Sequence, residues 1–178
     1  DISLSSTSLK ENESSGTTVG TLSSTDQDAG DSHTYSLVSG TGSTHNSSFS
    51  ISGSNLLTAA SFDFESQYSY NIRIRTADSG GSTYEEAFTI YVIPINESPT
   101  DISLSSTSLK ENESSGTTVG ALSSTDVDAG DSHTYSLVSG SGSTDNASFA
   151  ISGSNLNTAA SFDFESQGSY NIRIRTAD

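Results

Sequence analysis

The sequence predicts an all-β protein built from tandem Greek-key β-sandwich domains. Residues 1–78 and 101–178 are near-copies that differ at only eight positions. Within each copy, apolar residues alternate with polar ones over short runs, which is the period of half-buried strands. Turn-forming Gly, Ser, Asn and Asp separate these runs. About seven such strands per copy is the pattern of a sandwich, and no stretch shows a helical period.

The expected strands of the first copy follow one another at regular intervals. The apolar residues that mark them are, in order, Ile2 and Leu4; Val19 and Leu22; Tyr35 and Leu37; Phe49 and Ile51; Leu56, which begins a strand; Tyr70, Ile72 and Ile74; and Phe88, Ile90 and Val92. At most, residues 59–65 form one helical turn. Arg73 and Arg75 alternate with the isoleucines, so we expect them to face outward and to pair with Glu at the surface.

The domain boundary is predicted at the only two prolines, Pro94 and Pro99. Proline cannot donate to a sheet ladder, so it ends the last strand and stiffens the residues that follow. This gives a first repeat over 1–99, with its linker at 94–100, and a second repeat over 100–178.

The second repeat stops before any counterpart of Phe88, Ile90 and Val92, so we expect it to lack its last strand. Three explanations remain open at this point. The limits of the segment are arbitrary, a strand from a neighbouring chain completes the second repeat, or the strand at 84–93 serves the second repeat in a permuted arrangement.

Composition excludes several functional classes. The chain has 22 acidic and 6 basic residues, a net charge of −16 and no basic patch, so nucleic acid is not an expected partner. Cysteine is absent, so stability must come from the core or from metal. No apolar run approaches a membrane span in length. No nucleophile elbow or phosphate-binding loop is present, and near-copies in tandem are typical of spacers and multivalent binders, not of enzymes.

Acidic residues gather at five places. These are Glu11-Asn12, Asp26-x-Asp28, Asp63-x-Glu65, Ala77-Asp78 and Asn96-Glu97-x-Pro99, and the first four recur 100 residues later. Each group taken alone is also explained as a turn, because Asp and Asn bond their own backbone. An EF-hand loop at 26–30 fits poorly, because its Gly comes early and Leu37 stands where the closing Glu belongs.

Taken together, the five motifs resemble those of the cadherin repeat in its bacterial cadherin-like form, in the same order along nearly the whole chain. The resemblance implies Ca²⁺ bound between successive domains, and loop carboxylates suit the six to eight oxygen ligands of this ion. The implied complete site comprises Glu11, Asp63, Glu65, Asn96, Glu97, Asp126, Asp128 and Asp178. The implied half-sites are Asp26, Asp28 and Asp78 at one end, and Glu111, Asp163 and Glu165 at the other.

The sequence departs from the family pattern in two ways. Pro94 stands where the linker usually begins with Asp, and Glu97-Ser98 replaces the more common Asp-Asn, which leaves the number of ions open. The chain has no Trp, so the strand-exchange adhesion of some family members is not expected.

The resemblance implies an extracellular location and a structural function. We expect a calcium-rigidified spacer in a large bacterial surface adhesin or filament, which mediates cell adhesion by extending a distal binding region. Neighbouring repeats would be its partners. The alternative is a module that grips carbohydrate or self-associates with calcium. Tyr68 is the best candidate for stacking on a sugar, but Gly168 replaces it in the second repeat.

Overall fold

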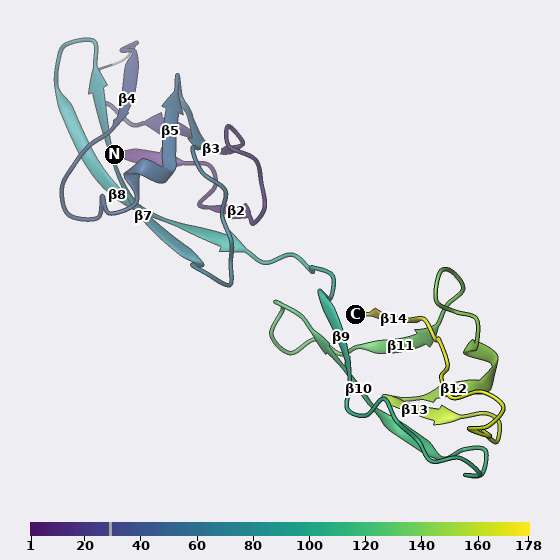
Figure 1. The fold of residues 1–178 in the computed structure, drawn as a ribbon. Coiled ribbons are helices and arrows are strands. Elements are labelled where there is room, and N and C mark those ends of the chain that lie inside the picture. The colour runs from purple at the N-terminus through teal and green to yellow at the C-terminus, as the bar shows by residue number, and fades with distance from the viewer. Residues whose placement is uncertain (29) are drawn as a thin grey trace. The chain divides into compact units, whose positions relative to one another are not determined.

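The computed structural model describes residues 1–28 and 30–178, so Ala29 of the acidic loop at 26–31 lies outside the described residues. The chain forms two compact units, Asp1–Ile95 and Asn96–Asp178 (Figure 1). The described residues form strands and two short 3₁₀ turns, η1 (Asn46–Ser48) and η2 (Asn146–Ser148), with no α-helix among them. The all-β prediction is therefore confirmed. Over the same residues, no helix has the length and apolar character needed to cross a membrane.

The first unit is a sandwich of two four-stranded sheets, ordered β1-β3-β6-β5 and β2-β8-β7-β4. Its strands are β1 (Ile2–Leu4), β2 (Ser8–Lys10), β3 (Thr18–Ser24), β4 (His33–Leu37), β5 (Phe49–Ser52), β6 (Asn55–Thr58), β7 (Ser69–Asp78) and β8 (Thr83–Ile93). All pairings are antiparallel except that of β2 with β8. This strand order is that of an immunoglobulin-type Greek-key sandwich.

Each run predicted from alternation corresponds to a strand of this unit, and β2 is an addition. The alternation along β7 and β8 turns Ile72, Ile74 and Ile90 inward, where each is fully buried. The rings of Phe49 and Phe62 pack in the same core with their centroids 5.2 Å apart and their planes tilted by 39°. All eight positions at which the two copies differ are exposed or half-buried in this unit, so the core residues within 1–78 are identical to their counterparts within 101–178.

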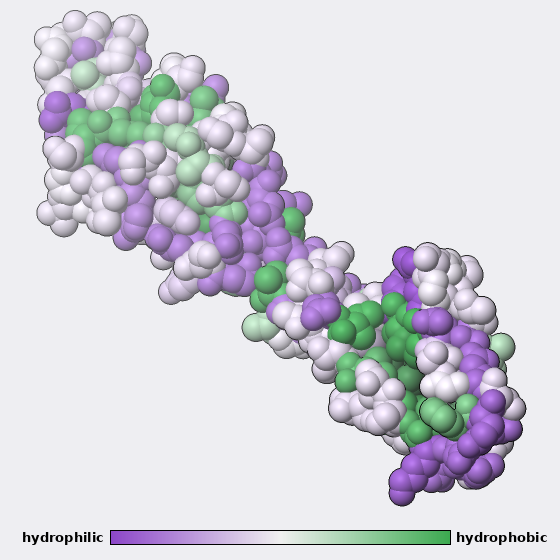
Figure 2. All heavy atoms as spheres, viewed as in Figure 1, coloured by the Kyte–Doolittle hydropathy of each residue, from purple (hydrophilic) through white to green (hydrophobic). Residues whose placement is uncertain are grey.

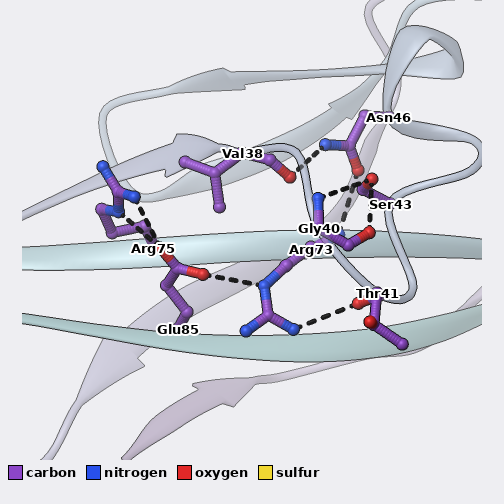
Figure 3. Close-up of polar contacts among 8 residues, drawn as sticks. All are labelled: Val38, Gly40, Thr41, Ser43, Asn46, Arg73, Arg75 and Glu85. Atoms are coloured by element: carbon purple, nitrogen blue, oxygen red, sulfur yellow. Dashed lines mark hydrogen bonds and ion pairs between the residues drawn. The ribbon is translucent and has the colours of Figure 1, made fainter.

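The outer face of β7 carries the two arginines, and both bond Glu85 of β8, at 2.8 Å from Arg73 and 2.6 Å from Arg75 (Figure 3). This confirms the expected surface pairing with Glu. Arg73 also donates through Nη1 to the Thr41 carbonyl and through its backbone N–H to Asn46 Oδ1, which fastens the loop between β4 and β5 onto β7.

The second unit has a four-stranded sheet, β12-β13-β10-β9, and a two-stranded sheet, β11-β14. Its strands are β9 (Asp101–Leu104), β10 (Thr118–Thr125), β11 (Thr134–Leu137), β12 (Phe149–Ser152), β13 (Asn155–Thr158) and β14 (Ile174–Ala177). The counterparts of β2 and of the first half of β7 are not strands here, although their sequences are identical.

The strand at 83–93 belongs to the first unit, where β8 pairs with β7 on one side and with β2 on the other. This excludes the permuted arrangement. As the sequence predicts, the second unit is the one without this strand. Its buried cluster contains Phe149, Leu156 and Phe162, a much smaller core than that of the first unit.

Candidate metal centre

Strand β7 separates two groups of acidic side chains in the first unit. Asp63 and Glu65 come just before it, and Asp78 ends it. A strand of ten residues spans roughly 33 Å, so the two groups lie at opposite ends of the unit. We call Asp26, Asp31 and Asp78 the loop cluster, and Glu11, Asp63 and Glu65 the turn cluster. The same names apply to the equivalent residues of the second unit.

The loop cluster of the first unit brings carboxylate oxygens of Asp26, Asp31 and Asp78 within 4.8 Å of one another. Asp26 Oδ1 accepts a hydrogen bond from the Asp28 N–H, and its Oδ2 bonds His33 Nε2 at 3.2 Å. These bonds, led by the Asp28 N–H, lower the pKa of Asp26 from its ordinary value. Asp26 is therefore ionised at neutral pH, as a cation ligand must be.

The loop cluster of the second unit has the same core, with carboxylate oxygens of Asp126, Asp131 and Asp178 within 4.8 Å. The Asp126 side chain is only 4% exposed and bonds His133 Nε2 at 3.0 Å. That bond is the main reason why the pKa of Asp126 is lowered. Carboxylates this close together repel one another unless a cation lies among them.

Two further predicted residues lie against this cluster within the second unit. Asn96 Nδ2 donates to Asp178 Oδ2 at 2.6 Å, and the Glu97 N–H donates to Asp128 Oδ2 at 2.6 Å. Asp128 in turn donates its own N–H to Asp126 Oδ1 at 3.2 Å. A continuous set of contacts therefore joins the predicted residues 96, 97, 126, 128 and 178.

Asp31 and Asp131 were not singled out from the sequence. Each lies in the same acidic loop as the predicted aspartates, shortly before β4 or β11, and the structure places it in the close triad. Asp28 is not a member of that triad and contributes its backbone N–H. The sequence feature that could have indicated Asp31 and Asp131 is the Gly directly before each of them. Gly30 and Gly130 have a positive φ, which is typical of a tight turn.

Glu11 of the turn cluster is buried, with 2% of its surface exposed. Its Oε1 accepts the Ile95 N–H at 2.8 Å, and its Oε2 accepts the Phe64 N–H at 2.9 Å. One carboxylate oxygen of Glu11 lies within 4.8 Å of one of Glu65. Asn12 beside it has a φ of 60°, a left-handed conformation that Asn tolerates better than most residues. The Glu-Asn motif therefore has two explanations: Glu11 accepts two backbone N–H groups and Asn12 fits a left-handed backbone conformation, and the Glu11 carboxylate also suits a metal.

Asp63 lies just before a single turn at 64–66, within the segment where the sequence predicts at most one helical turn. Its Oδ2 accepts the Ser66 hydroxyl at 2.7 Å and its Oδ1 the Ser66 N–H at 3.1 Å. The hydroxyl bond is the largest cause of the lowered pKa of Asp63, as the Ser166 hydroxyl is for Asp163. In the second unit, Glu111, Asp163 and Glu165 present oxygens within 4.8 Å, and all three residues are exposed.

The donor chemistry of these clusters fits Ca²⁺. Every candidate ligand is a carboxylate or amide oxygen on a loop, on a turn or at the end of a strand, and the chain has no Cys. His33 and His133 bond carboxylates and form no nitrogen-rich site of the kind zinc prefers. Two carboxylates about 4 Å apart repel by roughly 1 kcal/mol in water and about 4 kcal/mol near a protein surface, and a divalent cation would reverse this repulsion.

Comparison with known proteins identifies the family. A family model for the cadherin domain matches residues 5–96 and 105–178. Protocadherin Fat 4 of Mus musculus is 34% identical over 121 residues, which is 65% of this chain and 2% of that protein. Protocadherin alpha-2 of Homo sapiens is 31% identical over 130 residues, which is 68% of this chain and 14% of that protein. The chain therefore spans only a small part of these curated relatives.

Solved structures share the fold. Extracellular cadherin domains 1–4 of protocadherin gamma B7 superpose with a TM-score of 0.61 at 26% identity, over 98% of this chain and 45% of that one. Human protocadherin-24 EC1-2 gives a TM-score of 0.75 at 20% identity, over 99% of this chain and 87% of that one. The family match over both repeats, with the sandwich fold and the acidic motifs in their expected order, shows that this chain belongs to the cadherin domain family.

Proposed function

We propose that the chain is a calcium-rigidified spacer of a large extracellular adhesin or surface filament, which mediates cell adhesion by extending a distal binding region. The observation that carries this proposal is the presence of acidic clusters at both ends of each of two near-identical units. Copies of one module add length and not a new chemistry, and cadherin domains are adhesion modules of extracellular proteins.

The proposed Ca²⁺ ligands are those that the motifs predict, with two additions. For the complete site they are Glu11, Asp63, Glu65, Asn96, Glu97, Asp126, Asp128 and Asp178, joined by Asp131. For the half-sites they are Asp26, Asp28 and Asp78, joined by Asp31, and Glu111, Asp163 and Glu165. Bound Ca²⁺ would cancel the repulsion among these carboxylates and hold successive repeats stiffly. Affinities of roughly 10⁻⁴ to 10⁻³ M are typical of extracellular calcium modules.

A bacterial source is part of the proposal and depends on the form of the motifs alone. The curated relatives named above are mammalian proteins. Their match supports the cadherin domain and its extracellular setting, and it does not bear on which organism carries this near-identical pair of repeats.

Calcium titration by calorimetry, with small-angle scattering in calcium and in chelator, tests the spacer function. We expect chelator to change the maximum dimension of the chain, because the acidic linker loses the ion that stiffens it. The two copies provide a matched pair of variants. Asp126→Asn should abolish the calcium dependence of the dimension, whereas Asp26→Asn should remove only binding at a half-site. An unchanged dimension in wild-type protein with and without chelator would refute the proposal.

Calcium-dependent self-association is the second candidate function. The observation that favours it is a solved structure with 26% identity, which is described as a cis-dimer of protocadherin gammaB7 EC3-6. Analytical ultracentrifugation in calcium and in chelator separates this function from that of a monomeric spacer.

Carbohydrate binding stays a prediction based on Tyr68, whose surface is 61% exposed. A glycan array tests it, with Tyr68→Ala as the control.

A further inference from the structure

Three hydroxyl groups join the two sheets of the first unit beside its loop cluster. Ser24 ends β3 in one sheet, and its Oγ lies 3.1 Å from the Tyr35 hydroxyl and 2.9 Å from Thr76 Oγ1. Tyr35 of β4 and Thr76 of β7 lie directly opposite each other in the other sheet. We call these three residues the hydroxyl bridge. The buried cluster between the sheets is apolar, so a polar connection at one end of it calls for an explanation.

Hydroxyl groups are common in this chain, so their presence alone carries no argument. Figure 2 shows residues of intermediate hydropathy, the class of Ser, Thr and Gly, over much of the surface of the first unit. The hydroxyl bridge differs from such residues in its burial. Thr76 is only 6% exposed, and Ser24 and Tyr35 are half-buried, whereas the neighbouring Ser23 is exposed. Because a buried hydroxyl needs a hydrogen-bond partner, each member of the bridge depends on the others.

The hydroxyl bridge and the acidic site beside it are in register along the chain. His33 and Asp78 lie opposite each other in the ladder of β4 with β7, two residues further along than Tyr35 and Thr76. Side chains two residues apart share one face of a strand, so the bridge and the site lie on the same inner face. The pairs of residues separated by two positions are Ser24 and Asp26, Tyr35 and His33, and Thr76 and Asp78.

The loop cluster takes its carboxylates from both sheets. Asp26 follows β3, and Asp78 ends β7, yet their carboxylate oxygens lie within 4.8 Å of each other and of one from Asp31. The distance between Asp26 and Asp78 therefore depends on the spacing of the sheets at this end. Ca²⁺–oxygen distances span only about 2.3–2.6 Å, so ligands from two sheets must be held in place to bind one ion together.

Two polar connections set that spacing. The outer one is the bond from Asp26 Oδ2 to His33 Nε2 at 3.2 Å, and the inner one is the hydroxyl bridge. Both belong to one small pocket of about 110 Å³, whose lining includes Ser24, Thr76, Asp26, His33 and Asp78. The bridge therefore lies next to the carboxylates and not at a remote point of the sandwich.

The second unit repeats the arrangement. Ser124 Oγ lies 3.1 Å from the Tyr135 hydroxyl and 2.7 Å from Thr176 Oγ1. Asp126 bonds His133 beside it at 3.0 Å. These contacts are kept although β14 is much shorter than β7, so the bridge does not depend on a full-length strand.

We propose that the hydroxyl bridge is a positioning element for cation binding, which fixes the sheet spacing so that the loop cluster is arranged for Ca²⁺ before the ion arrives. The inference rests on the calcium function proposed above and gives Ser24, Tyr35 and Thr76 a role without contact to the ion. The Ser24 hydroxyl has one proton, so it donates to one partner and accepts from the other. Loss of this hydroxyl therefore removes both bonds, whereas Tyr35→Phe removes only one.

A Ca²⁺ titration of the 178-residue chain followed by NMR tests the proposal in each unit separately. The Asp28 amide, which donates to Asp26 Oδ1, reports on the first loop cluster, and the Asp128 amide reports on the second. Ser24→Ala should raise the midpoint calcium concentration at Asp28 by roughly 10- to 100-fold, the usual cost of losing a group that orients a metal ligand. The midpoint at Asp128 should not change. Ser124→Ala should have the reverse effect.

Three further variants separate positioning from mere support of the fold. Ser24→Thr keeps the hydroxyl and should restore the wild-type midpoint. Ser23→Ala removes the exposed neighbouring hydroxyl and should leave the midpoint unchanged. Tyr35→Phe should raise the midpoint by less than Ser24→Ala, and it provides the test if Ser24→Ala does not fold. Denaturation in chelator measures stability independently of the ion.

The outcomes distinguish this proposal from the function on which it rests. A purely structural bridge would lower the free energy of unfolding in chelator and leave the calcium midpoint of the folded protein unchanged. Equal midpoints in wild type, Ser24→Ala and Tyr35→Phe would therefore overturn the positioning role alone. Absence of any calcium response at Asp28 and Asp128 in the wild type would overturn both the positioning role and the calcium-rigidified spacer.

Discussion

At the residue scale, some side chains make the same hydrogen bonds in both units, although only the first unit contains β8. Thr58 is almost fully buried, donates from Oγ1 to the Ser14 carbonyl at 2.9 Å and accepts the Thr17 N–H at 2.9 Å. Thr158 makes the same two bonds, each at 3.0 Å. The partners are nearby loop residues, so these contacts do not depend on β8.

Thr58→Val should therefore destabilise the first unit by about 1 kcal/mol, because the shape is kept while the Thr17 N–H and the Ser14 carbonyl each lose one hydrogen-bond partner. Chemical denaturation followed by hydrogen exchange in each unit measures the loss. Thr158→Val is the matched control and should lower protection in the second unit alone. Equal losses in both units from either single change would contradict this local account.

Glu11 shows what the sequence could not predict at this scale. The motif identified it as a ligand, and its pairing with Asn12 suited that role. Its two backbone donors, Phe64 and Ile95, lie 53 and 84 residues away along the chain. Contacts at such separations depend on the fold, so no local pattern reveals that this carboxylate also joins the turn before β7 to Ile95, two residues after β8.

At the element scale, identical sequences form different structures. Residues 69–78 form β7 over their whole length, whereas the same ten residues at 169–178 are a strand only over Ile174–Ala177. The period of two predicts a strand in both places. Strand formation depends on a partner, and β8 supplies it only to the first unit. The short β2 escaped prediction for the same reason, because it is defined by parallel pairing with residues 91–93.

The pairing of β7 with β8 should depend on pH through Glu85. Hydrogen bonds from Arg73, and then from Arg75, lower the pKa of this carboxyl. A lowered folded-state pKa contributes stability above the unfolded-state pKa, near 4.3, and the contribution is lost as pH falls through the folded value. The stability gap between wild type and Glu85→Gln should thus be present at pH 7 and close at acid pH.

Denaturant unfolding of the first unit at a series of pH values measures that gap. Glu86→Gln is the control, because Glu86 is adjacent on β8 but forms no ion pair with either arginine. A gap that stays constant down to pH 2 would show that Glu85 acts through its shape and not its charge.

At the scale of the whole molecule, the resemblance to the cadherin repeat implied that the acidic motifs lie at the two ends of each repeat. Asp31 and Asp131 could not be predicted as cluster members, because each follows a Gly with a positive φ, and spacing along the chain does not give the position of the next side chain. The eight differences between the copies leave the core residues unchanged. Any difference in stability between the units should therefore come mainly from the presence or absence of β8.

Unfolding of the chain should for this reason occur in two steps, with the second unit first. Its core lacks the strand that supplies Ile90 and completes the burial of Ile72 and Ile74 in the first unit. Hydrogen exchange resolved by residue should show slow amides at Tyr70 and Ile72, which pair with β8, and fast amides at Tyr170 and Ile172. The amides of Asn171 and Arg173 should stay protected, because they donate to Asp145 and Asn146. Ile72→Ala should cost about 2–5 kcal/mol in the later step, because it leaves a cavity in a closed core. Ile172→Ala should cost much less, since that side chain already borders an open groove. Equal protection of the two segments, or equal costs of the two substitutions, would mean that the second unit closes its core without a β8 strand.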